Sequence, residues 1–508
     1  MEDWLTPLYD AAGMRAVDAW AIEQQGVPSL RLMEAAGTAV AEGVQGIAPG
    51  GSVRIVCGKG LNGGDGLVAA RLLHEWGFEC EVLLLWPGAE LRGDAAANLE
   101  RLPVEPRQVE PGQVAEALRG SAAIVDAILG TGFEGEPRSP VDEAIAAING
   151  AGAPVVAADV ASGVDASSGE VAGAAVDAHL TVTFHAAKLG HQIAPGKAHR
   201  GELRVADIGI PPGAPAPVAG GEITDAVLAE LPHRRADSTK FTSGQVLIAG
   251  GSRGLTGAVC LVAEAAIRAG AGYGTAMVPA GLEPIFEAKL TEVMTRGCAD
   301  AGGALDEGAA AEIIEAAKSA DALVLGPGLG RADSAHAVAR AVAAGAQAPL
   351  VLDADGLNAH AEALDPLAGR AAPTILTPHA GELGRLLGRS SDDVGAHRLV
   401  CAREAAERTR AIVVLKGDDT LVVDGRDAEA PVAVGTLASP ALATAGTGDT
   451  LAGTIGALLA RGVEPLRAAC AAVHANARAG RLAAERIGSA DSVIASDVIQ
   501  ALPRGLVP

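Results

Sequence analysis

Short apolar runs alternate with longer Ala-rich stretches along most of the chain. In the first part, runs rich in Val, Ile and Leu predict buried strands at 53–57, 82–85, 123–126, 154–157 and 180–184. In the second part, similar runs predict strands at 245–248, 322–325, 350–352 and 411–415. Between the strands, Ala-rich stretches such as 67–75 and 141–148 predict helices. Strands that alternate with helices are typical of parallel sheets with right-handed crossovers, so both parts are predicted to be α/β.

A Pro- and Gly-rich segment at 210–221 interrupts this pattern. Closely spaced prolines cannot sustain a helix or a central strand, so the segment predicts a linker. We therefore expect a domain at 1–212, a linker at 213–224 and a second domain at 225–508. Each domain is predicted to have three layers, with a sheet between two layers of helices, and 508 residues are enough for two such domains.

Charge and composition limit the classes of molecule that the protein is expected to bind. The net charge of −23 disfavours binding to nucleic acids or anionic membranes, because long-range repulsion opposes the approach. No apolar run is long enough to predict a membrane span, and the acidic start Met1–Trp4 is not typical of a secretory signal. The six cysteines are far apart and form no CxxC pair, which is typical of reduced thiols. These observations predict a cytoplasmic protein without nucleic-acid or membrane partners.

The strand at 53–57 leads into an unusually Gly-rich segment, 58–66, with the sequence Gly-Lys-Gly-Leu-Asn-Gly-Gly-Asp-Gly. Its spacing matches G-x-G-x-x-G, the pattern of dehydrogenase-type dinucleotide sites. Any tight strand-to-helix turn favours glycine, so the match alone does not identify such a site. Asn62 and Asp65 add amide and carboxylate oxygens beside bare backbone N–H groups. A loop of this kind can hold a phosphate on its amides and a cation on its oxygens.

Further polar residues follow the neighbouring predicted strands. Asp126 ends one strand, Asp159 ends the next, and Ser162 follows shortly after. Ligands of parallel α/β sheets bind at the carboxyl ends of the strands, so we expect these residues and Asn62 to surround one pocket. Each one alone would more often be a helix cap or turn residue, but the four together indicate a site.

With these motifs, the first part resembles the NAD(P)H-hydrate epimerase domain from about Leu8 to Pro211. The resemblance rests on the segments 32–37 (Leu-Met-Glu-Ala-Ala-Gly), 62–65, 130–132, 159–163, 181–184, 188–190 and 207–211. It implies a Rossmann-like fold and interconversion of the two epimers of hydrated NADH and NADPH, called NADHX and NADPHX. It also implies a potassium ion held by Asn62, Asp126 and Ser162.

The same resemblance implies the substrate contacts and a catalytic Asp159. The implied contacts are Leu61, Asn62, Gly63, Gly64, Asp65, Gly130, Thr131, Gly132, Phe133, Glu134, Gly135, Glu136 and Asp159. The chain departs from the family at two positions, with Leu61 where Asn is usual and Ala161 where Pro is usual. Leu61 removes one polar contact to the substrate, and Ala161 loosens the turn that presents Ser162.

A second Gly-rich segment, 444–453 (Thr-Ala-Gly-Thr-Gly-Asp-Thr-Leu-Ala-Gly), precedes an Ala- and Leu-rich helical stretch. Glycines at a helix N-terminus expose N–H groups to an anion, and the helix dipole adds to the attraction. Asp449 could take a proton from a hydroxyl that faces this anion, so the arrangement suits phosphoryl transfer. Motifs at 326–330, 353–358, 377–382 and 416–417 also follow predicted strands and are expected at the same sheet edge.

The second part, from about Asp225 to Leu502, resembles the ribokinase-like superfamily and, more closely, the ADP-dependent NAD(P)H-hydrate dehydratases. The segments 243–252, 256–258 and 353–358 carry this resemblance. It implies that S-NAD(P)HX is phosphorylated by the nucleotide and then loses phosphate, which leaves AMP when ADP is used. Magnesium is expected with the nucleotide, and the choice between ADP and ATP stays open. The implied catalytic base is Asp449; implied substrate contacts are Ala258, Gly330, His379 and Asp449, and implied nucleotide contacts are Lys416, Gly417, Asp418, Asp419, Thr420 and Gly448.

Two alternatives remain open from the sequence. The anion site and Asp449 would equally serve a kinase of a vitamin or sugar, which would accumulate a phosphorylated product. Domains similar to the first part also occur in RNA-processing scaffolds, although the net charge opposes that function. We expect the repair enzyme, with NADHX and NADPHX as its small-molecule substrates and with a homo-oligomeric assembly.

Overall fold

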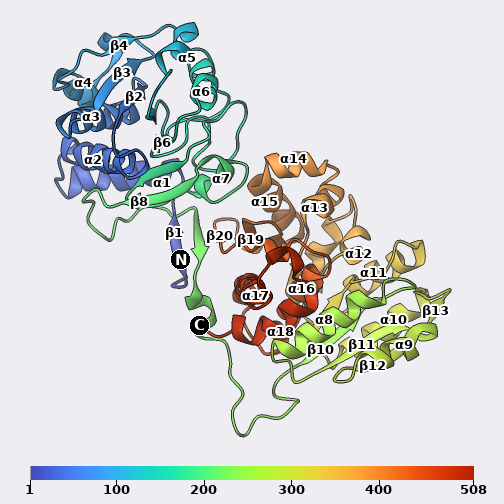
Figure 1. Cartoon of the computed structure of the whole chain (residues 1–508). Helices are drawn as coiled ribbons and strands as arrows, with labels where there is room; N and C mark the ends of the chain where they lie inside the picture. Colours follow the sequence, from blue (N-terminus) through green and yellow to red (C-terminus); the bar gives the residue numbers. More distant parts are fainter. Residues whose placement is uncertain (1) are drawn as a thin grey trace. The chain divides into compact units, whose positions relative to one another are not determined.

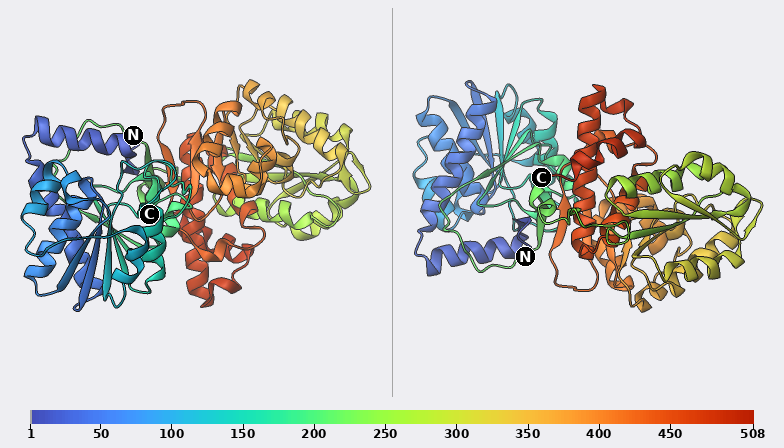
Figure 2. Two further views of the ribbon diagram at one scale, coloured as in Figure 1. Left: turned by 90° about the horizontal axis from the view of Figure 1, so that it is seen from above. Right: turned by 90° about the horizontal axis from the view of Figure 1, so that it is seen from below.

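The computed structural model describes residues 2–508, which form two compact units. The N-terminal unit runs from Pro7 to Gly220. The C-terminal unit runs from Gly221 to Pro508 and also contains the beginning of the chain, up to Thr6. Both units consist of a sheet with helices on its two faces, which confirms the predicted α/β class (Figure 1 and Figure 2).

The N-terminal unit contains one parallel sheet in the order β4-β3-β2-β5-β6-β7-β8. Its strands are β2 (Ser52–Cys57), β3 (Glu79–Leu84), β4 (Arg107–Gln108), β5 (Ala123–Ala127), β6 (Val155–Ala158), β7 (Leu180–Phe184) and β8 (Glu202–Ala206). Its helices are α1 (Ala11–Ala19), α2 (Ser29–Ile47), α3 (Leu61–Glu75), α4 (Gly93–Glu100), α5 (Val114–Ala117), α6 (Val141–Gly150) and α7 (Gly196–His199). A π-helical turn, Trp20–Gln24, continues α1.

The central strands of this sheet are the ones that the apolar runs predict. Residues of β5, β6 and β7 are buried along their whole length, because helices cover both faces of a parallel sheet. The strand β8 was not predicted, since at the sheet edge most of its residues are at least partly exposed and it carries no continuous apolar run. The degree of burial therefore explains why β5, β6 and β7 were predicted and β8 was not.

The segment around Asn62 was expected to be a loop, and this expectation is wrong. Helix α3 already begins at Leu61, so Asn62 and Asp65 lie in its first turns. The glycines here serve close packing, because a Cβ built on Gly63 would lie 2.0 Å from the backbone oxygen of Gly58. The helix N-terminus is thereby drawn tightly against the end of β2, which points its free N–H groups toward the sheet edge.

The C-terminal unit is built on an eleven-stranded sheet, counted over residues 2–508, in the order β1-β9-β20-β19-β18-β17-β16-β15-β10-β11-β12. Its strands are β1 (Leu5–Leu8), β9 (Gly220–Ile223), β10 (Gln245–Ala249), β11 (Tyr273–Pro279), β12 (Met294–Cys298), β15 (Ala322–Leu325), β16 (Leu350–Leu352), β17 (Thr374–Leu376), β18 (Ile412–Leu415), β19 (Thr420–Asp424) and β20 (Val432–Gly435). The strands from β18 to β12 are parallel, and β19 is antiparallel to both of its neighbours.

The helices of this unit cover the sheet, and a small hairpin is attached to them. The helices are α8 (Thr256–Arg268), α9 (Glu283–Lys289), α10 (Glu307–Ala317), α11 (Asp333–Gly345), α12 (Asp355–Asn358), α13 (Ala380–Leu387), α14 (Ser391–Ala396), α15 (Arg398–Thr409), α16 (Thr447–Ala460), α17 (Pro465–Ile487) and α18 (Ala495–Gly505). The hairpin pairs β13 (Asp300–Ala301) with β14 (Ala304–Leu305). Across residues 2–508, no helix combines the length and the apolar character that crossing a membrane requires.

The edge of the eleven-stranded sheet includes the beginning of the chain. Trp4 is fully buried in the core of the C-terminal unit, and its backbone oxygen accepts bonds from the N–H and Oγ1 of Thr224, at 3.2 and 2.9 Å. The strand β9 lies inside the segment 213–224 that was expected to be a linker. Residues up to Thr6, expected in the first domain, thus belong to the C-terminal unit, because their apolar side chains find their core there.

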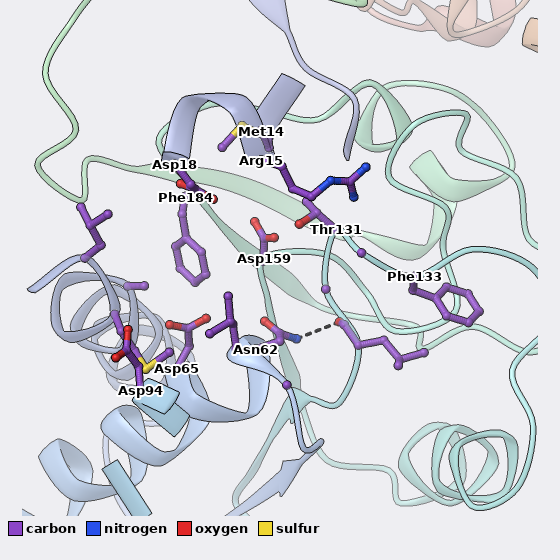
Figure 3. Close-up of a pocket in the computed structure, with 18 of the residues that line it drawn as sticks. Met14, Arg15, Asp18, Asn62, Asp65, Asp94, Thr131, Phe133, Asp159 and Phe184 are labelled. Atoms are coloured by element: carbon purple, nitrogen blue, oxygen red, sulfur yellow. Dashed lines mark hydrogen bonds between the residues drawn. The ribbon is translucent and has the colours of Figure 1, made fainter. Parts of the chain in front are cut away.

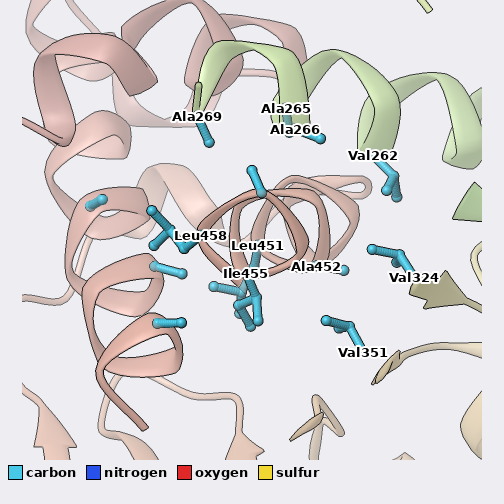
Figure 4. Packing of buried hydrophobic residues seen from close by; sticks show 14 of the residues in the cluster. Val262, Ala265, Ala266, Ala269, Val324, Val351, Leu451, Ala452, Ile455 and Leu458 are labelled. Carbon is cyan, nitrogen blue, oxygen red and sulfur yellow. The ribbon is translucent and has the colours of Figure 1, made fainter. Parts of the chain in front are cut away.

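Helix α16 is enclosed by apolar side chains of α8 and of the strands β15 and β16 (Figure 4). Small residues allow this enclosure, since a Cβ on Gly453 would lie 2.3 Å from the backbone oxygen of Val262. The many alanines of the chain serve the same close packing of helices. The N-terminus of α16, with Gly448 and Asp449, is consequently held rigidly beside the sheet edge.

Candidate active sites

The N-terminal unit contains a cavity of about 730 Å³ at the carboxyl ends of its strands (Figure 3). Its wall is formed by α1, α2, the beginning of α3 and the segments that follow β5, β6 and β7. The predicted site residues that line it are Leu61, Asn62, Asp65, Gly130, Thr131, Gly132, Phe133, Glu134 and Asp159. The other predicted positions, Gly63, Gly64, Gly135, Glu136, Asp126 and Ser162, are not in the wall.

Asp126, Ser162 and Asn62 are joined behind this wall by a short network. The Ser162 hydroxyl donates to Asp126 Oδ1 at 2.6 Å, and the Ser162 N–H donates to Oδ2 at 2.8 Å. Ser162 Oγ accepts the N–H of Leu129, whose carbonyl accepts the Asn62 amide at 2.7 Å. Asn62 Oδ1 is buried and has no hydrogen-bond partner within residues 2–508. Burial raises the pKa of Asp126 to about 6, although its bonds from Ser162 act against this shift.

Asp159 is held by a buried lysine that the candidate residues from the sequence did not include. Lys188 is 1% exposed, and its ammonium donates to Asp159 Oδ1 at 2.6 Å, Thr183 Oγ1 at 2.7 Å and the carbonyl of Phe184 at 3.0 Å. Burial would raise the pKa of Asp159, but the Lys188 ammonium outweighs it and lowers this pKa. Asp159 is therefore an ionised carboxylate at neutral pH.

His191 completes the frame around this ion pair. Its Nδ1 accepts the backbone N–H of Lys188 at 3.0 Å, and its Nε2 lies 3.0 Å from the backbone oxygen of Asp159. Burial, and then the charge of Lys188, lower the pKa of His191 to about 3, so the ring is neutral and Nε2–H donates. Asp159 has a φ of 64°, a strained value for a residue other than glycine, and these contacts hold it there.

Two further carboxyl groups face the same cavity. Asp65 on α3 and Asp18 on α1 both line it, and Asp18 was not among the residues that the sequence indicated. Burial raises the pKa of Asp65 well above its usual value, and it raises that of Asp18 to about 6. The sequence signal for Lys188 was its place directly after a predicted strand, whereas Asp18 lies on an ordinary amphipathic helix. The cavity therefore combines one ionised carboxylate with two carboxyl groups whose pKa values are raised by burial.

The second site gathers at the carboxyl ends of β16, β17 and β18. Lys416 follows β18, and its ammonium lies 3.0 Å from Asp353 Oδ1 and 3.7 Å from Glu382 Oε2. A Cβ built on Gly448 would lie 3.3 Å from the Lys416 Nζ, so the N-terminus of α16 meets the same ammonium. Burial lowers the pKa of Lys416, but Asp353 and Glu382 outweigh it and raise this pKa, so the ammonium stays charged.

Asp449, in the first turn of α16, has an unusual acidity. Burial, followed by the negative charge of Asp353, raises the pKa of Asp449 to about 7, although Lys416 acts in the opposite direction. A carboxyl group with a pKa near the working pH can take and return a proton, which is the property of a general base. The sequence prediction of Asp449 as the base therefore agrees with its electrostatic surroundings, whereas Asp353 and Glu382 are charged partners that it did not assign.

The predicted substrate residues of this unit lie around the same edge. His379 caps α13, since its Nδ1 accepts the N–H groups of Gly381 and Glu382, and its side chain is 54% exposed. Gly330 donates its N–H to Asp355 Oδ2 at 2.9 Å. Ala258 lies in the first turn of α8, where its Cβ would be 3.2 Å from a Cβ built on Gly328. The His379 imidazole is thus accessible to solvent.

The predicted nucleotide segment, 416–420, is fixed by one buried ion pair. Asp419 is 1% exposed, and its carboxylate binds the guanidinium of Arg398 through Oδ2 at 2.9 Å and Oδ1 at 2.8 Å. The Thr420 Oγ1 donates to the carbonyl of Gly417 at 2.8 Å, which tightens the turn. The ion pair with Arg398 therefore holds Asp419, and with it the segment 416–420, in a fixed position.

The fold and the two sites define an α/β enzyme that carries a separate candidate active site in each unit. The model of the NAD(P)H-hydrate dehydratase family matches residues 246–504, and the model of the YjeF-related protein N-terminus matches residues 29–190. The bifunctional NAD(P)H-hydrate repair enzyme Nnr of Salinibacter ruber is 40% identical across 98% of this chain and 96% of that protein. The chain therefore belongs to the family of bifunctional NAD(P)H-hydrate repair enzymes, which confirms both resemblances.

Other relatives have the same name. The enzyme of Moorella thermoacetica is 38% identical across 98% of this chain and 96% of that protein, and that of Coxiella burnetii is 37% identical across 97% and 98%. The solved ADP/ATP-dependent NAD(P)H-hydrate dehydratase from Bacillus subtilis is 29% identical and covers 55% of this chain and 94% of its own, with a TM-score of 0.48.

Proposed function

We propose that the N-terminal unit epimerises NADHX and NADPHX, and that the C-terminal unit dehydrates the S epimers with ADP or ATP. The observation that supports the dehydratase most directly is Asp449, with its pKa of about 7, at the N-terminus of α16 beside the charged Lys416. The observation that supports the epimerase is the buried Asp159–Lys188 pair in the wall of the cavity. Family membership joins the two activities in one chain.

In the proposed dehydratase, Asp449 takes the proton of the misplaced hydroxyl while that oxygen attacks the terminal phosphorus of the nucleotide. Lys416 and the N–H groups at the start of α16 compensate the charge of the transferred phosphoryl group. Phosphate then leaves with its oxygen, a proton leaves the adjacent carbon, and the double bond is restored. His379, Gly330 and Ala258 are the proposed substrate contacts, and the segment 416–420 with Gly448 contacts the nucleotide.

Magnesium fits this site as a companion of the nucleotide. Within residues 2–508 no cluster of three or more ligating side chains is available for a metal, so the nucleotide phosphates would be its principal ligands. Asp353 and Glu382 are the carboxylates that could complete its coordination. Bound there, the ion would neutralise phosphate charge.

Potassium fits the N-terminal unit. The unpaired Asn62 Oδ1, the Asp126 carboxylate and the Ser162 hydroxyl are oxygen donors of the type that an alkali cation prefers, and Asn62 Oδ1 has no other buried partner within residues 2–508. We propose that these three residues hold it and that the cation orders the turn after β5. We further propose that the enzyme works in the cytoplasm as a homo-oligomer, which light scattering of the purified chain would test.

The decisive experiment is to incubate chemically hydrated NADH with the protein and with ADP, ATP or no nucleotide. Return of the absorbance of reduced nicotinamide together with release of phosphate supports the dehydratase, whereas accumulation of a phosphorylated substrate supports a kinase instead. Consumption of both epimers supports the epimerase. A reaction that stops after one epimer would contradict the epimerase and leave the dehydratase standing.

A further inference from the structure

The charges around the epimerase cavity do not balance. Five carboxyl groups line it, and three of them, Asp18, Asp65 and Asp159 (Figure 3), interact electrostatically with one another and with the buried ammonium of Lys188. The other charged groups of the lining are Asp94, Glu134, Arg15 and Lys59. An ammonium has three N–H donors, and those of Lys188 are engaged by Asp159, Thr183 and the carbonyl of Phe184. Lys188 consequently has no donor left for Asp18 or Asp65. Lys188 therefore compensates the charge of Asp159 but not that of the other two, which favours protonation within this group of carboxylates.

The three carboxyl groups are suited to different roles. Asp159 is bound to Lys188 and stays ionised, so it can accept a proton but has none to give. Burial raises the pKa of Asp65 well above its usual value, which favours the protonated form of this group. Asp18 is only partly buried, and its pKa of about 6 allows it to gain and lose a proton near neutrality. Asp18 is thus the group that can supply an acid and then recover its proton.

The placement of Asp18 also points to a ligand rather than to a structural contact. Its carboxyl group takes part in none of the hydrogen bonds or ion pairs found among residues 2–508, although it faces the cavity. Directly after α1 the chain forms the π-helical turn Trp20–Gln24, in which Ile22 also lines the cavity. Turns of this kind are uncommon and occur frequently at functional sites.

We propose that Asp18 is a catalytic acid of the epimerase and that it works opposite Asp159. Asp18 protonates the hydroxyl on carbon six as the carbon–oxygen bond breaks, so that water leaves and the ring nitrogen lone pair forms a cationic C=N bond. Water then adds to the other face of carbon six, and Asp159 accepts the proton that this water loses. The proton returns from Asp159 to Asp18 through the solvent of the cavity. This proposal rests on the proposed epimerase function.

The test compares Asp18→Asn with Asp10→Asn on the same helix. Asp10 caps α1 through the N–H of Gly13, and asparagine caps helices equally well, so this control keeps the helix and leaves the cavity unchanged. Each variant receives a single purified epimer of NADHX without nucleotide, and the appearance of the other epimer is followed by chromatography. We expect Asp18→Asn to lower kcat by on the order of a hundredfold with KM nearly unchanged, and Asp10→Asn to match the wild type.

A pH profile separates catalysis from structure. The charged groups that face Asp18 are Lys188, Asp159 and Asp65 from neighbouring elements and Arg15 on its own helix. An acid works only while protonated, so kcat/KM of the wild type should fall as pH rises through about 6. The kcat/KM of Asp18→Asn should lack this decrease with rising pH, the limb of the profile that reports the acid, and Asp18→Glu should show it again. If Asp18→Asn keeps the full rate and the same limb, the proposal is wrong; a wild type that does not epimerise refutes the epimerase function itself.

Discussion

The two sites contain the same combination, one lysine among several carboxyl groups, but they expose the lysine differently. Lys188 is 1% exposed and its three donors are bound by the protein. The Lys416 side chain is 22% exposed, and only its contact with Asp353, at 3.0 Å, is of hydrogen-bond length. A buried lysine whose donors are all engaged keeps its partner carboxylate ionised, whereas a partly exposed lysine can also bind an incoming anion. This difference in burial agrees with the proposed proton transfer at the first site and the proposed phosphoryl transfer at the second.

The largest effect is expected from removing Asp449, the proposed base of the C-terminal site. Asp449→Asn should reduce the nucleotide-dependent step by about a hundredfold to ten-thousandfold, because the hydroxyl loses its proton acceptor. Phosphate release from the S epimer with ADP or ATP measures this. Asp333→Asn is the matched control, since Asp333 also lies in the first turn of a helix but is exposed and outside both sites. A variant at Asp449 that keeps about half of the wild-type rate would exclude it as the base.

The second prediction tests whether the buried Lys188 contributes to stability as well as to function. Lys188→Met leaves the Asp159 charge buried and unpaired, so the free energy of unfolding of the N-terminal unit should fall by about 3–5 kcal/mol. Lys416→Met should cost the C-terminal unit less and mainly raise KM for the nucleotide. Calorimetry of the full chain measures both, with Lys318→Met as a surface control. Equal losses of stability at Lys188 and Lys416 would contradict the comparison.

The third prediction concerns stability and pH at Asp449. Its folded-state pKa, about 7, lies above the value of an unfolded aspartate, so the folded state binds the extra proton between about pH 4 and 7. Stability therefore falls as pH rises through this window. Asp449→Asn removes the effect and should be more stable than the wild type above pH 7, by up to roughly 4 kcal/mol, with little difference near pH 4. Unfolding in urea across this range would show the opposite trend if Asp449 were stabilised as a carboxylate.

The smallest predicted effect concerns Leu61, which is 67% exposed at the mouth of the epimerase cavity. Leu61→Asn adds one polar group that can bond the substrate, a contribution of about 1 kcal/mol, so KM should fall by roughly fivefold with kcat unchanged. Leu61→Gln controls for polarity with a longer side chain. Epimerisation rates at several substrate concentrations measure the change, and a lower kcat would indicate that the side chain obstructs the reaction instead.

The sequence predicts the centre of each sheet better than its edges. Buried runs such as 53–57 and 322–325 become β2 and β15, because strands covered on both faces need continuous apolar sequence. The strand β9 was not predicted, since it lies in a Gly-rich stretch and is stabilised by a partner strand far away in the sequence. Local propensity also misjudged the start of α3, where close packing overrides the low helix propensity of glycine.

The same limit applies to the sites. Asp449 was predicted because it directly follows a Gly-rich motif, and Asp159 because it ends a predicted strand. Lys188 follows a predicted strand, but its role, like that of Asp18, depends on which groups surround it after folding. The resemblance implied a nucleotide contact at Asp419, but it gave no sign that the carboxylate of this residue pairs with Arg398, which comes 21 residues earlier in the chain.

The pairing of β1 with β9 has a consequence for folding during translation. Trp4 and Leu5 are translated long before the strand that they pair with, β9, which begins at Gly220. At translation speeds of about 5–20 residues per second, the N-terminal segment waits for roughly ten to forty seconds before its neighbour exists. The whole N-terminal unit is made during this interval. A tag or deletion near Trp4 and Leu5 should therefore impair folding of the C-terminal unit, although this unit is translated later.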